Sequence, residues 1–167
     1  MRVNHLPKKE AVKVLDCFSA DGLIWQEVKK RSKAKIQVLR IEKEKGKKGV
    51  YLPGDNLKYL STLDLSAFDV IDLDAFGVPF EQLRILFDRK FSGSVFVTFI
   101  QSMFGQLPIA MLEECGFTRR MVEKVPSLFS RSGRDHLLAY LSRHGVDLVQ
   151  IISISRKHYL HFLASVA

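Results

Sequence analysis

The sequence predicts a doubly wound α/β sheet that ends in an antiparallel hairpin, and three observations lead to this fold class. Short apolar runs alternate five times with amphipathic segments, as strands and helices do in such sheets. Two further apolar runs follow, joined by a short polar turn. The 167 residues, 47% of them hydrophobic, suffice for one buried core. We therefore expect residues 1–167 to form a single domain.

The first half of the predicted sheet contains three strands and one clear helix. The expected strands are residues 12–18, 35–42 and 50–52, and the expected helix is residues 23–31. Ser19 or Asp21 is placed to cap that helix through its side chain. A loop rich in lysine and glycine, residues 43–49, separates the second strand from the third, and a Pro-Gly-Asp-Asn turn follows at 53–56.

The second half begins with a strand at residues 68–73 and a helix that starts at Pro79. Phe80, Leu83, Leu86 and Phe87 recur at spacings of three and four, so they share one buried helix face. A strand at 94–100 is followed by a helix at 108–115, which Gly116 ends. Residues 132–135 resemble a capping box for a helix that ends near residue 145. The hairpin strands are expected at 148–155 and 158–165.

Sheets of this class bind ligands outside the carboxyl ends of their strands. The residues at those ends are 16–22, Glu42, Asp55, Asn56 and 74–77. A carboxylate after the second strand suits both hydroxyls of a ribose, and one after the third suits an adenine amine. The first turn holds only Gly22 where a dinucleotide site needs three glycines, which argues against NAD. The pattern therefore predicts a nucleoside site.

Residues 14–22 (Val-Leu-Asp-Cys-Phe-Ser-Ala-Asp-Gly), Glu42, residues 54–56 and residues 68–77 resemble, in order and spacing, the motifs of class I S-adenosylmethionine-dependent methyltransferases. The resemblance implies a Rossmann-like, mostly parallel seven-stranded sheet whose last strand is an antiparallel edge. It implies that S-adenosylmethionine is the cofactor, with Glu42 at its ribose and Asp55 at its adenine, and with Asn56 as a further contact. The residues implied at its methionine end are Asp16, Phe18, Ser19, Ala20 and Gly22.

The segment Asp-Leu-Asp-Ala-Phe-Gly at residues 72–77 resembles the Asp-Leu-Asp-Pro-Phe-Gly signature of tRNA guanine-N2 dimethyltransferases. The resemblance implies methyl transfer to an exocyclic base amine. Asp74 would accept the N–H of that amine, Phe76 would stack on the base, and Gly77 would permit close approach. Asp72 lies inside the strand, and we expect it to play a supporting part. The chain has Ala20 and Ala75 where the families have glycine and proline.

The charge is unevenly distributed along the chain, which has a net charge of +8. Residues 27–58 carry eleven Lys or Arg against four acids, and residues 116–144 carry six against two. Residues 61–90 carry six acids against three bases. Basic stretches around an acid-lined site favour a nucleic-acid partner, RNA more than DNA, with a separate recognition subunit or a second copy of the chain as further partners.

Two alternatives remain at this point. The first is a small-molecule methyltransferase, because an Asp-Ala pair such as Asp74-Ala75 also resembles metal-dependent O-methyltransferases. The second is a cofactor-binding partner subunit without turnover, which Ala20 and Ala75 favour.

Cysteine content, apolar runs and histidine spacing bear on location and on metals. Two cysteines and the absence of an apolar leader or of a run near 20 apolar residues predict a cytoplasmic protein without a membrane span. His158 and His161 point to opposite faces of a strand, so we expect no metal site.

Overall fold

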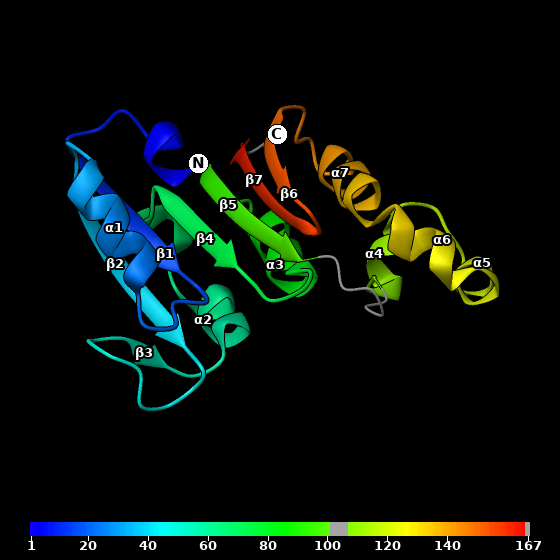
Figure 1. Ribbon diagram of the computed structural model, residues 1–167, viewed down its shortest axis with the longest axis horizontal. Helices are drawn as coiled ribbons and strands as arrows, with labels where there is room; N and C mark the ends of the chain where they lie inside the picture. The colour runs from blue at the N-terminus through cyan, green and yellow to red at the C-terminus, as the bar shows by residue number, and fades with distance from the viewer. Residues whose placement is uncertain (101–106, 166–167) are drawn as a thin grey trace.

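The computed structural model describes residues 1–100 and 107–165, which form a seven-stranded sheet with helices on both faces (Figure 1). The strands are β1 (Ala11–Asp16), β2 (Lys35–Glu42), β3 (Leu52–Pro53), β4 (Val70–Asp74), β5 (Gly93–Ile100), β6 (Val149–Ile154) and β7 (Lys157–Ala164). Their order is β3-β2-β1-β4-β5-β7-β6, and β7 alone runs in the direction opposite to the other six strands. The predicted fold class is confirmed. The antiparallel last strand lies one position inside the edge, which β6 forms.

The helices are α1 (Leu23–Arg31), α2 (Asn56–Thr62), α3 (Phe80–Asp88), α4 (Ile109–Glu114), α5 (Arg119–Lys124), α6 (Pro126–Arg131) and α7 (Gly133–Arg143). In Figure 1, α1 and the short 3-10 helix η1 (Arg2–His5) lie in front of the sheet, while α2 and α3 lie behind it. No helix among the described residues is long and apolar enough to cross a bilayer.

Two hydrophobic cores, one on each face, hold these layers to the central strands. Val14 of β1 and Trp25 of α1 belong to the core in front, whereas the next residue of the strand, Leu15, belongs to the larger core behind. Leu83 of α3 packs in that larger core, as its helical spacing predicted. Because successive residues of a strand point to opposite faces, β1 is buried on both.

The boundaries of α1 and β2 agree with the predictions, but two predicted caps are wrong. Gly22 is the N-cap of α1, and no side chain of the described residues caps it. Asp21 instead accepts a hydrogen bond from the backbone N–H of Lys48 (3.2 Å). Ser132 at the start of α7 likewise makes no capping hydrogen bond within the described part of the chain, and Asp135 pairs with Arg134.

Three short helices, α2, α5 and α6, were not predicted from the sequence. Each has six or seven residues, too few to display a clear apolar period. The connection from β2 to β3, by contrast, consists of nine residues, 43–51, and contains no helix. Parallel neighbours are usually joined by a crossover of a dozen or more residues with a helix in it, so this connection is unusually short.

Candidate functional site

A cavity of about 230 Å³ lies at the carboxyl ends of β1 and β4. The strand order reverses between these two strands, which is where sheets of this class bind ligands. The predicted site residues in its lining are Asp16, Phe18, Ser19, Ala20, Gly22 and Asp74. The other lining residues are Asp21, Leu23, Ile24 and Asp72. The residues predicted for the methionine end therefore share one cavity with Asp74, whereas the other two residues predicted for the acceptor, Phe76 and Gly77, are not in its lining.

The loop between β1 and α1 forms one wall of the cavity. The backbone N–H of Ser19 donates to the carbonyl of Ile41 (3.2 Å), which ties this loop to β2. Ala20 and Gly22 both have left-handed backbone conformations, with φ of +42° and +74°. Alanine takes this conformation at a cost of about 1–2 kcal/mol. Position 22 needs glycine more strictly, because a Cβ atom there would lie 2.7 Å from the Arg40 guanidinium.

Ser19 provides the observation that tests the fit of a cofactor. Its side chain is buried, and its Oγ has no hydrogen-bond partner in the described structure. Buried hydroxyls are nearly always paired, so an unpaired one in a cavity wall suits a ligand with a polar group. Asp16 adds a carboxyl group to the same cavity, which suits a cationic ligand. These residues fit the amino-acid end of S-adenosylmethionine, which carries an ammonium group and a sulfonium.

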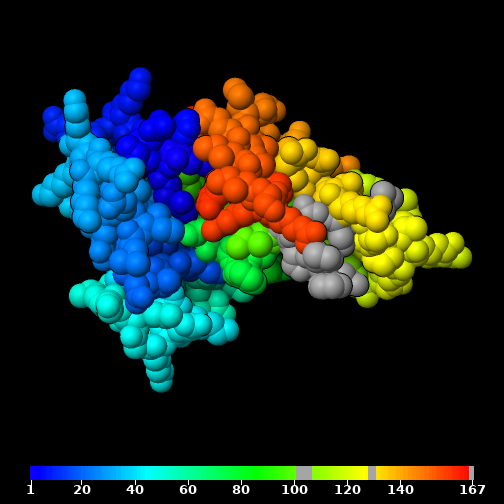
Figure 2. Space-filling view, viewed as in Figure 1, coloured from blue at the N-terminus to red at the C-terminus, as the bar shows by residue number. Residues whose placement is uncertain are grey.

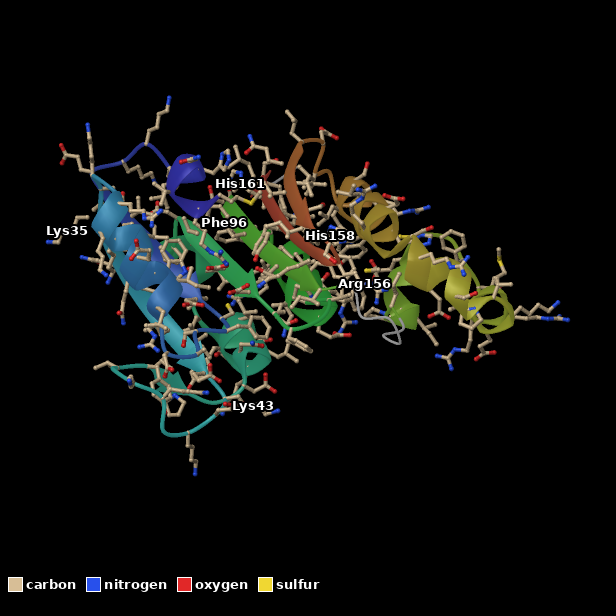
Figure 3. All side chains as sticks on the ribbon, in the orientation of Figure 1. Lys35, Lys43, Phe96, Arg156, His158 and His161 are labelled. Carbon is tan, nitrogen blue, oxygen red and sulfur yellow. The ribbon has the colours of Figure 1, made fainter. Side chains whose placement is uncertain are left out.

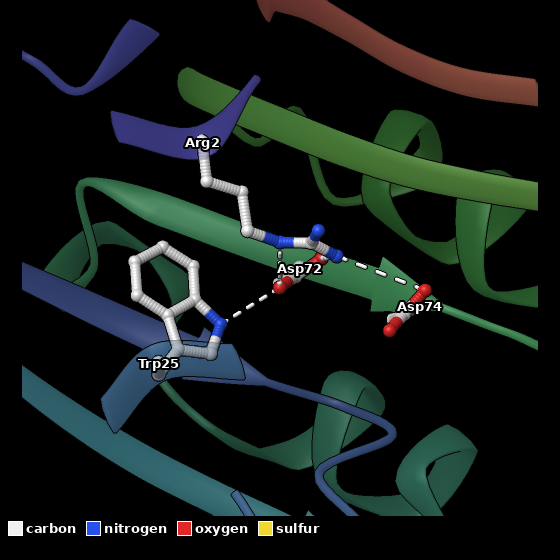
Figure 4. Close-up of polar contacts among 4 residues, drawn as sticks. All are labelled: Arg2, Trp25, Asp72 and Asp74. Atoms are coloured by element: carbon white, nitrogen blue, oxygen red, sulfur yellow. Dashed lines mark hydrogen bonds and ion pairs between the residues drawn. The ribbon is translucent and has the colours of Figure 1, made fainter. Parts of the chain in front are cut away.

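Asp72 is the centre of a buried polar cluster beside this cavity (Figure 4). Arg2 donates through Nε to Oδ2 (2.7 Å) and through Nη2 to Oδ1 (2.9 Å), and Trp25 donates through Nε1 to Oδ2 (2.7 Å). Asp72 is only 1% exposed, and a buried carboxylate needs such donors. Arg2 Nη2 also lies 3.7 Å from Oδ1 of Asp74. One guanidinium therefore joins both acids of β4, with Asp72 in the expected supporting position.

Asp16 lies next to Asp72 in the sheet, because the two residues are partners in the β1–β4 register. Burial raises the pKa of Asp16 to about 8, and the negative charge of Asp72 adds to the rise. Burial also raises the pKa of Asp72, but the charge and hydrogen bonds of Arg2 act against that rise. At neutral pH the carboxyl of Asp16 is therefore protonated, whereas Asp72 accepts the two hydrogen bonds of the Arg2 guanidinium.

Glu42, predicted at the ribose hydroxyls, is bound by backbone amides of its own chain. Its Oε2 accepts from the N–H of Ala20 (2.7 Å), and its Oε1 accepts from the N–H of Glu44 (3.0 Å). Arg40 links the same two loops, donating to the carbonyls of Ala20 (2.7 Å) and Lys48 (2.8 Å). Glu42 is not part of the described cavity lining, so a nucleoside would have to share its carboxylate with these amides.

Asp55 and Asn56 lie at the start of α2, also outside the described cavity lining. Asp55 is the N-cap residue, and its Oδ1 accepts from the N–H of Leu57 (2.9 Å). Asn56 donates through Nδ2 to the carbonyl of Cys17 (2.8 Å) and accepts from Nε2 of Gln82 (2.9 Å). Asp55 thus caps α2, and Asn56 attaches this helix to the end of β1 and to α3.

The segment that follows β4 is open to solvent. Ala75 is buried, whereas Phe76 is 93% exposed. Phe76 is therefore not a core residue, and its ring is open to solvent. Gly77 has a φ of +116°, and a Cβ atom there would have nothing within 4 Å, so conformation rather than space favours glycine. Asp74 is partly exposed and lines the cavity.

Two arginines of the site were not predicted from the sequence. Arg2 is 70 positions from its partner Asp72, and no motif connects them. Arg40 precedes Glu42 by two residues in β2, so the strand period places both on the same face, and this signal was available. Across residues 1–100 and 107–165, no group of three or more His, Cys, Asp or Glu side chains is arranged to hold a metal ion.

No family model and no curated protein matches this chain, but several solved structures match it over nearly its whole length. One is a protein described as an S-adenosylmethionine-dependent methyltransferase from Methanococcus maripaludis, with 14% identity, a TM-score of 0.57, and 98% of this chain and 81% of that one covered.

Two further structures have different substrates in their names. A protein described as a ribosomal RNA methyltransferase from Plasmodium falciparum has 17% identity and a TM-score of 0.56, over 95% of this chain and 89% of that one. Precorrin-6Y C5,15-methyltransferase from Geobacter metallireducens has 10% identity and a TM-score of 0.53, over 96% of this chain and 84% of that one. At such identities the likeness concerns the fold. The chain has the fold of class I S-adenosylmethionine-dependent methyltransferases.

Proposed function

We propose that this protein transfers the methyl group of S-adenosylmethionine to an exocyclic amine of a nucleic-acid base, in RNA more readily than in DNA. The observation that carries the proposal is the shared cavity, in which five residues expected at the cofactor and Asp74 line one space. The fold supports the choice of cofactor, and the open segment after β4 supports the choice of acceptor.

The amino-acid end of the cofactor lies against Asp16 and Ser19 in this proposal. Ser19 Oγ gains the hydrogen-bond partner that it lacks in the described structure. Asp16 loses its proton when a cationic ligand binds, because a nearby positive charge favours the carboxylate. When bound, the cofactor supplies an electrophilic methyl group on a positively charged sulfur. Glu42 and Asp55 lie on the β2 side, where ribose and adenine would extend.

Asp74 is the residue that we assign to the chemical step. An exocyclic amine is a weak nucleophile, because its lone pair is conjugated with the base. A carboxylate that accepts one N–H of the amine stabilises the positive charge that develops on nitrogen. Arg2, whose Nη2 lies 3.7 Å from Oδ1 of Asp74, attracts that carboxylate and restrains its position. Positioning supplies much of the remaining acceleration, since the reaction is an in-line displacement.

The acceptor is a base that the protein can reach outside a duplex. Phe76, with its exposed ring, offers a surface on which a flipped or single-stranded base can stack. Gly77 carries no side chain that would keep the base away. The net charge of +8 favours a polyanion over a small neutral acceptor.

The test is a transfer assay with the purified protein and methyl-labelled S-adenosylmethionine. Total RNA, total DNA and low-mass metabolites are supplied separately, with heat-denatured protein as the control. We expect label in RNA, on the exocyclic nitrogen of one type of base. Label in the metabolite fraction alone would identify a small-molecule methyltransferase. Cofactor binding without label in any fraction would identify a subunit without turnover, and both outcomes would overturn the proposal.

A further inference from the structure

The connection between β2 and β3 contains a lysine-rich segment, residues 43–49, which we call the lysine loop. It takes the place of the helix that usually joins two parallel strands. Four of its seven residues are lysines: Lys43, Lys45, Lys47 and Lys48. Only Lys47 forms an ion pair within the loop, with Glu44 (2.7 Å). The side chains of Lys43, Lys45 and Lys48 are exposed, so the loop presents a concentrated positive charge.

Hydrogen bonds attach the lysine loop to the wall of the cavity. Lys48 accepts from Arg40 through its carbonyl and donates to Asp21 through its N–H. Arg40 in turn donates to the carbonyl of Ala20, in the loop that lines the cavity. The backbone at Gly49 comes so close to Arg40 that a Cβ atom would lie 2.9 Å from Nη1. The loop therefore has a fixed place relative to the site.

The lysine loop and the acceptor segment leave the sheet at the same edge. Arg40, Asp16 and Asp72 are level in the register of β2, β1 and β4, so Glu42 is level with Asp74. Two strand spacings, about 10 Å, separate these strand ends. That span corresponds to about three nucleotides of a helical strand at 3.4 Å each. Phosphates of one strand could thus contact the loop while a base of the same strand reaches Phe76.

The pictures place the lysine loop away from the other lysines of β2. Lys35 and Lys43 lie at opposite ends of that strand (Figure 3). The cyan segment that contains the loop projects from the lower edge of the molecule (Figure 2). The exposed residues Lys29, Lys33 and Lys35 lie at the opposite end of β2, where α1 ends and β2 begins.

We propose that the lysine loop binds the phosphodiester backbone of a single-stranded or looped nucleic acid and so holds the target base at Asp74 and Phe76. This inference rests on the proposed function and adds the surface that recognises the substrate. RNA and DNA share the phosphate chemistry, and the experiment separates them.

The test compares two triple charge reversals in the full chain. One variant carries Lys43→Glu, Lys45→Glu and Lys48→Glu. The matched control carries Lys29→Glu, Lys33→Glu and Lys35→Glu, the same change of charge at the opposite edge. The probe is a fluorescent single-stranded RNA of about 20 nucleotides, with DNA of the same sequence in parallel. Affinity is measured by anisotropy at several salt concentrations between about 50 and 200 mM.

We expect the loop variant to bind RNA roughly tenfold or more weakly than the parent. The slope of log affinity against log salt should fall by about 2, since each single-strand phosphate contact contributes about 0.7. The control should retain most of the affinity, and both variants should keep the parent affinity for S-adenosylhomocysteine, measured without nucleic acid. If the DNA probe binds more strongly than the RNA probe, the loop would still be the binding surface, but its nucleic acid would be DNA.

Equal losses in the two variants, or a larger loss in the control, would overturn the inference, because the charge of the loop would then have no special part. The proposed function fails separately. If the parent protein binds RNA through the loop but does not bind S-adenosylhomocysteine, the inference about the loop would stand and the proposed methyltransferase activity would be refuted.

Discussion

At the carboxyl ends of β1 and β4, Asp16 and Asp72 are buried, and both oxygens of Asp72 have charged or indole donors. At the ends of β2 and β3, Glu42 and Asp55 are more exposed and accept hydrogen bonds from backbone amides. The first region is the cavity with Asp16, and the second contains Glu42, Asp55 and the lysine loop. Both lie along one edge of one sheet, yet their charge is balanced in different ways.

The difference indicates which part of the site exists before a ligand binds. Removing one partner from the buried cluster leaves a charge that is neither paired nor hydrated. Because such a charge is strongly destabilising, the arrangement of the cluster is tightly constrained. On the β2 side, water can replace each hydrogen bond at little cost, so Glu42 can exchange an amide for a ribose hydroxyl. We therefore expect large effects on stability from the buried cluster and smaller effects, on binding, from the open part of the edge.

The largest expected effect comes from Arg2→Gln. The substitution leaves Asp72 buried without its cation, so the free energy of unfolding should fall by about 3–5 kcal/mol. Urea denaturation at neutral pH measures this change. The double variant Arg2→Gln with Asp72→Asn is the control, and it should recover most of the loss because no charge remains unpaired. A loss below about 1 kcal/mol in the single variant would show that the cluster is not constrained as we describe.

Stability should fall as pH rises, because of Asp16. Its ordinary pKa is 3.8 and its folded pKa is about 8, so between these values the folded chain holds a proton that the unfolded chain has released. Unfolding then releases about one proton, which lowers stability by up to about 4 kcal/mol between about pH 5 and 8. Asp16→Asn should remove this slope in urea denaturation series. The same slope in parent and variant would assign the effect to another group.

Asp74→Asn should separate catalysis from cofactor binding. Loss of the carboxylate should lower the methyl-transfer rate by about 10²–10³-fold, since it acts on charge that develops in the transition state. Affinity for the cofactor should change by less than about 1 kcal/mol. Single-turnover assays and calorimetry measure the two quantities. Asp88→Asn, an exposed acid at the end of α3, is the matched control. Equal transfer rates in both variants would remove the catalytic assignment.

The smallest expected effect belongs to the exposed end of the edge. Phe76→Ala should weaken acceptor binding by about 1–3 kcal/mol through lost stacking, without affecting stability. Leu148→Ala removes a comparably exposed side chain, 81% exposed against 93%, far from this segment in the sequence. The KM for the identified nucleic acid measures the difference. A similar KM in the two variants would mean that the ring does not contact the base.

The sequence predicted the fold well, because the apolar runs of the central strands and the period of α3 are local signals. The residues of the β1–α1 loop that we propose for the cofactor were chosen by their order in the sequence, and in the structure they line one cavity. Arg2 could not be predicted, because its partner lies 70 positions away and only the fold brings them together. The capping of α1 was misjudged, because Asp21 pairs with a loop that the local pattern does not connect to it.

The central claim is that the cavity beside Asp16 binds S-adenosylmethionine, and calorimetry of this ligand at about pH 7 in two buffers of different ionisation enthalpy tests it most directly. The account predicts binding with release of about one proton, because the ligand ionises a carboxyl that is protonated in the free protein. Asp16→Asn should bind more weakly, with no dependence of the heat on the buffer. Absence of binding by the parent protein, or the same proton release in the variant, would contradict the account.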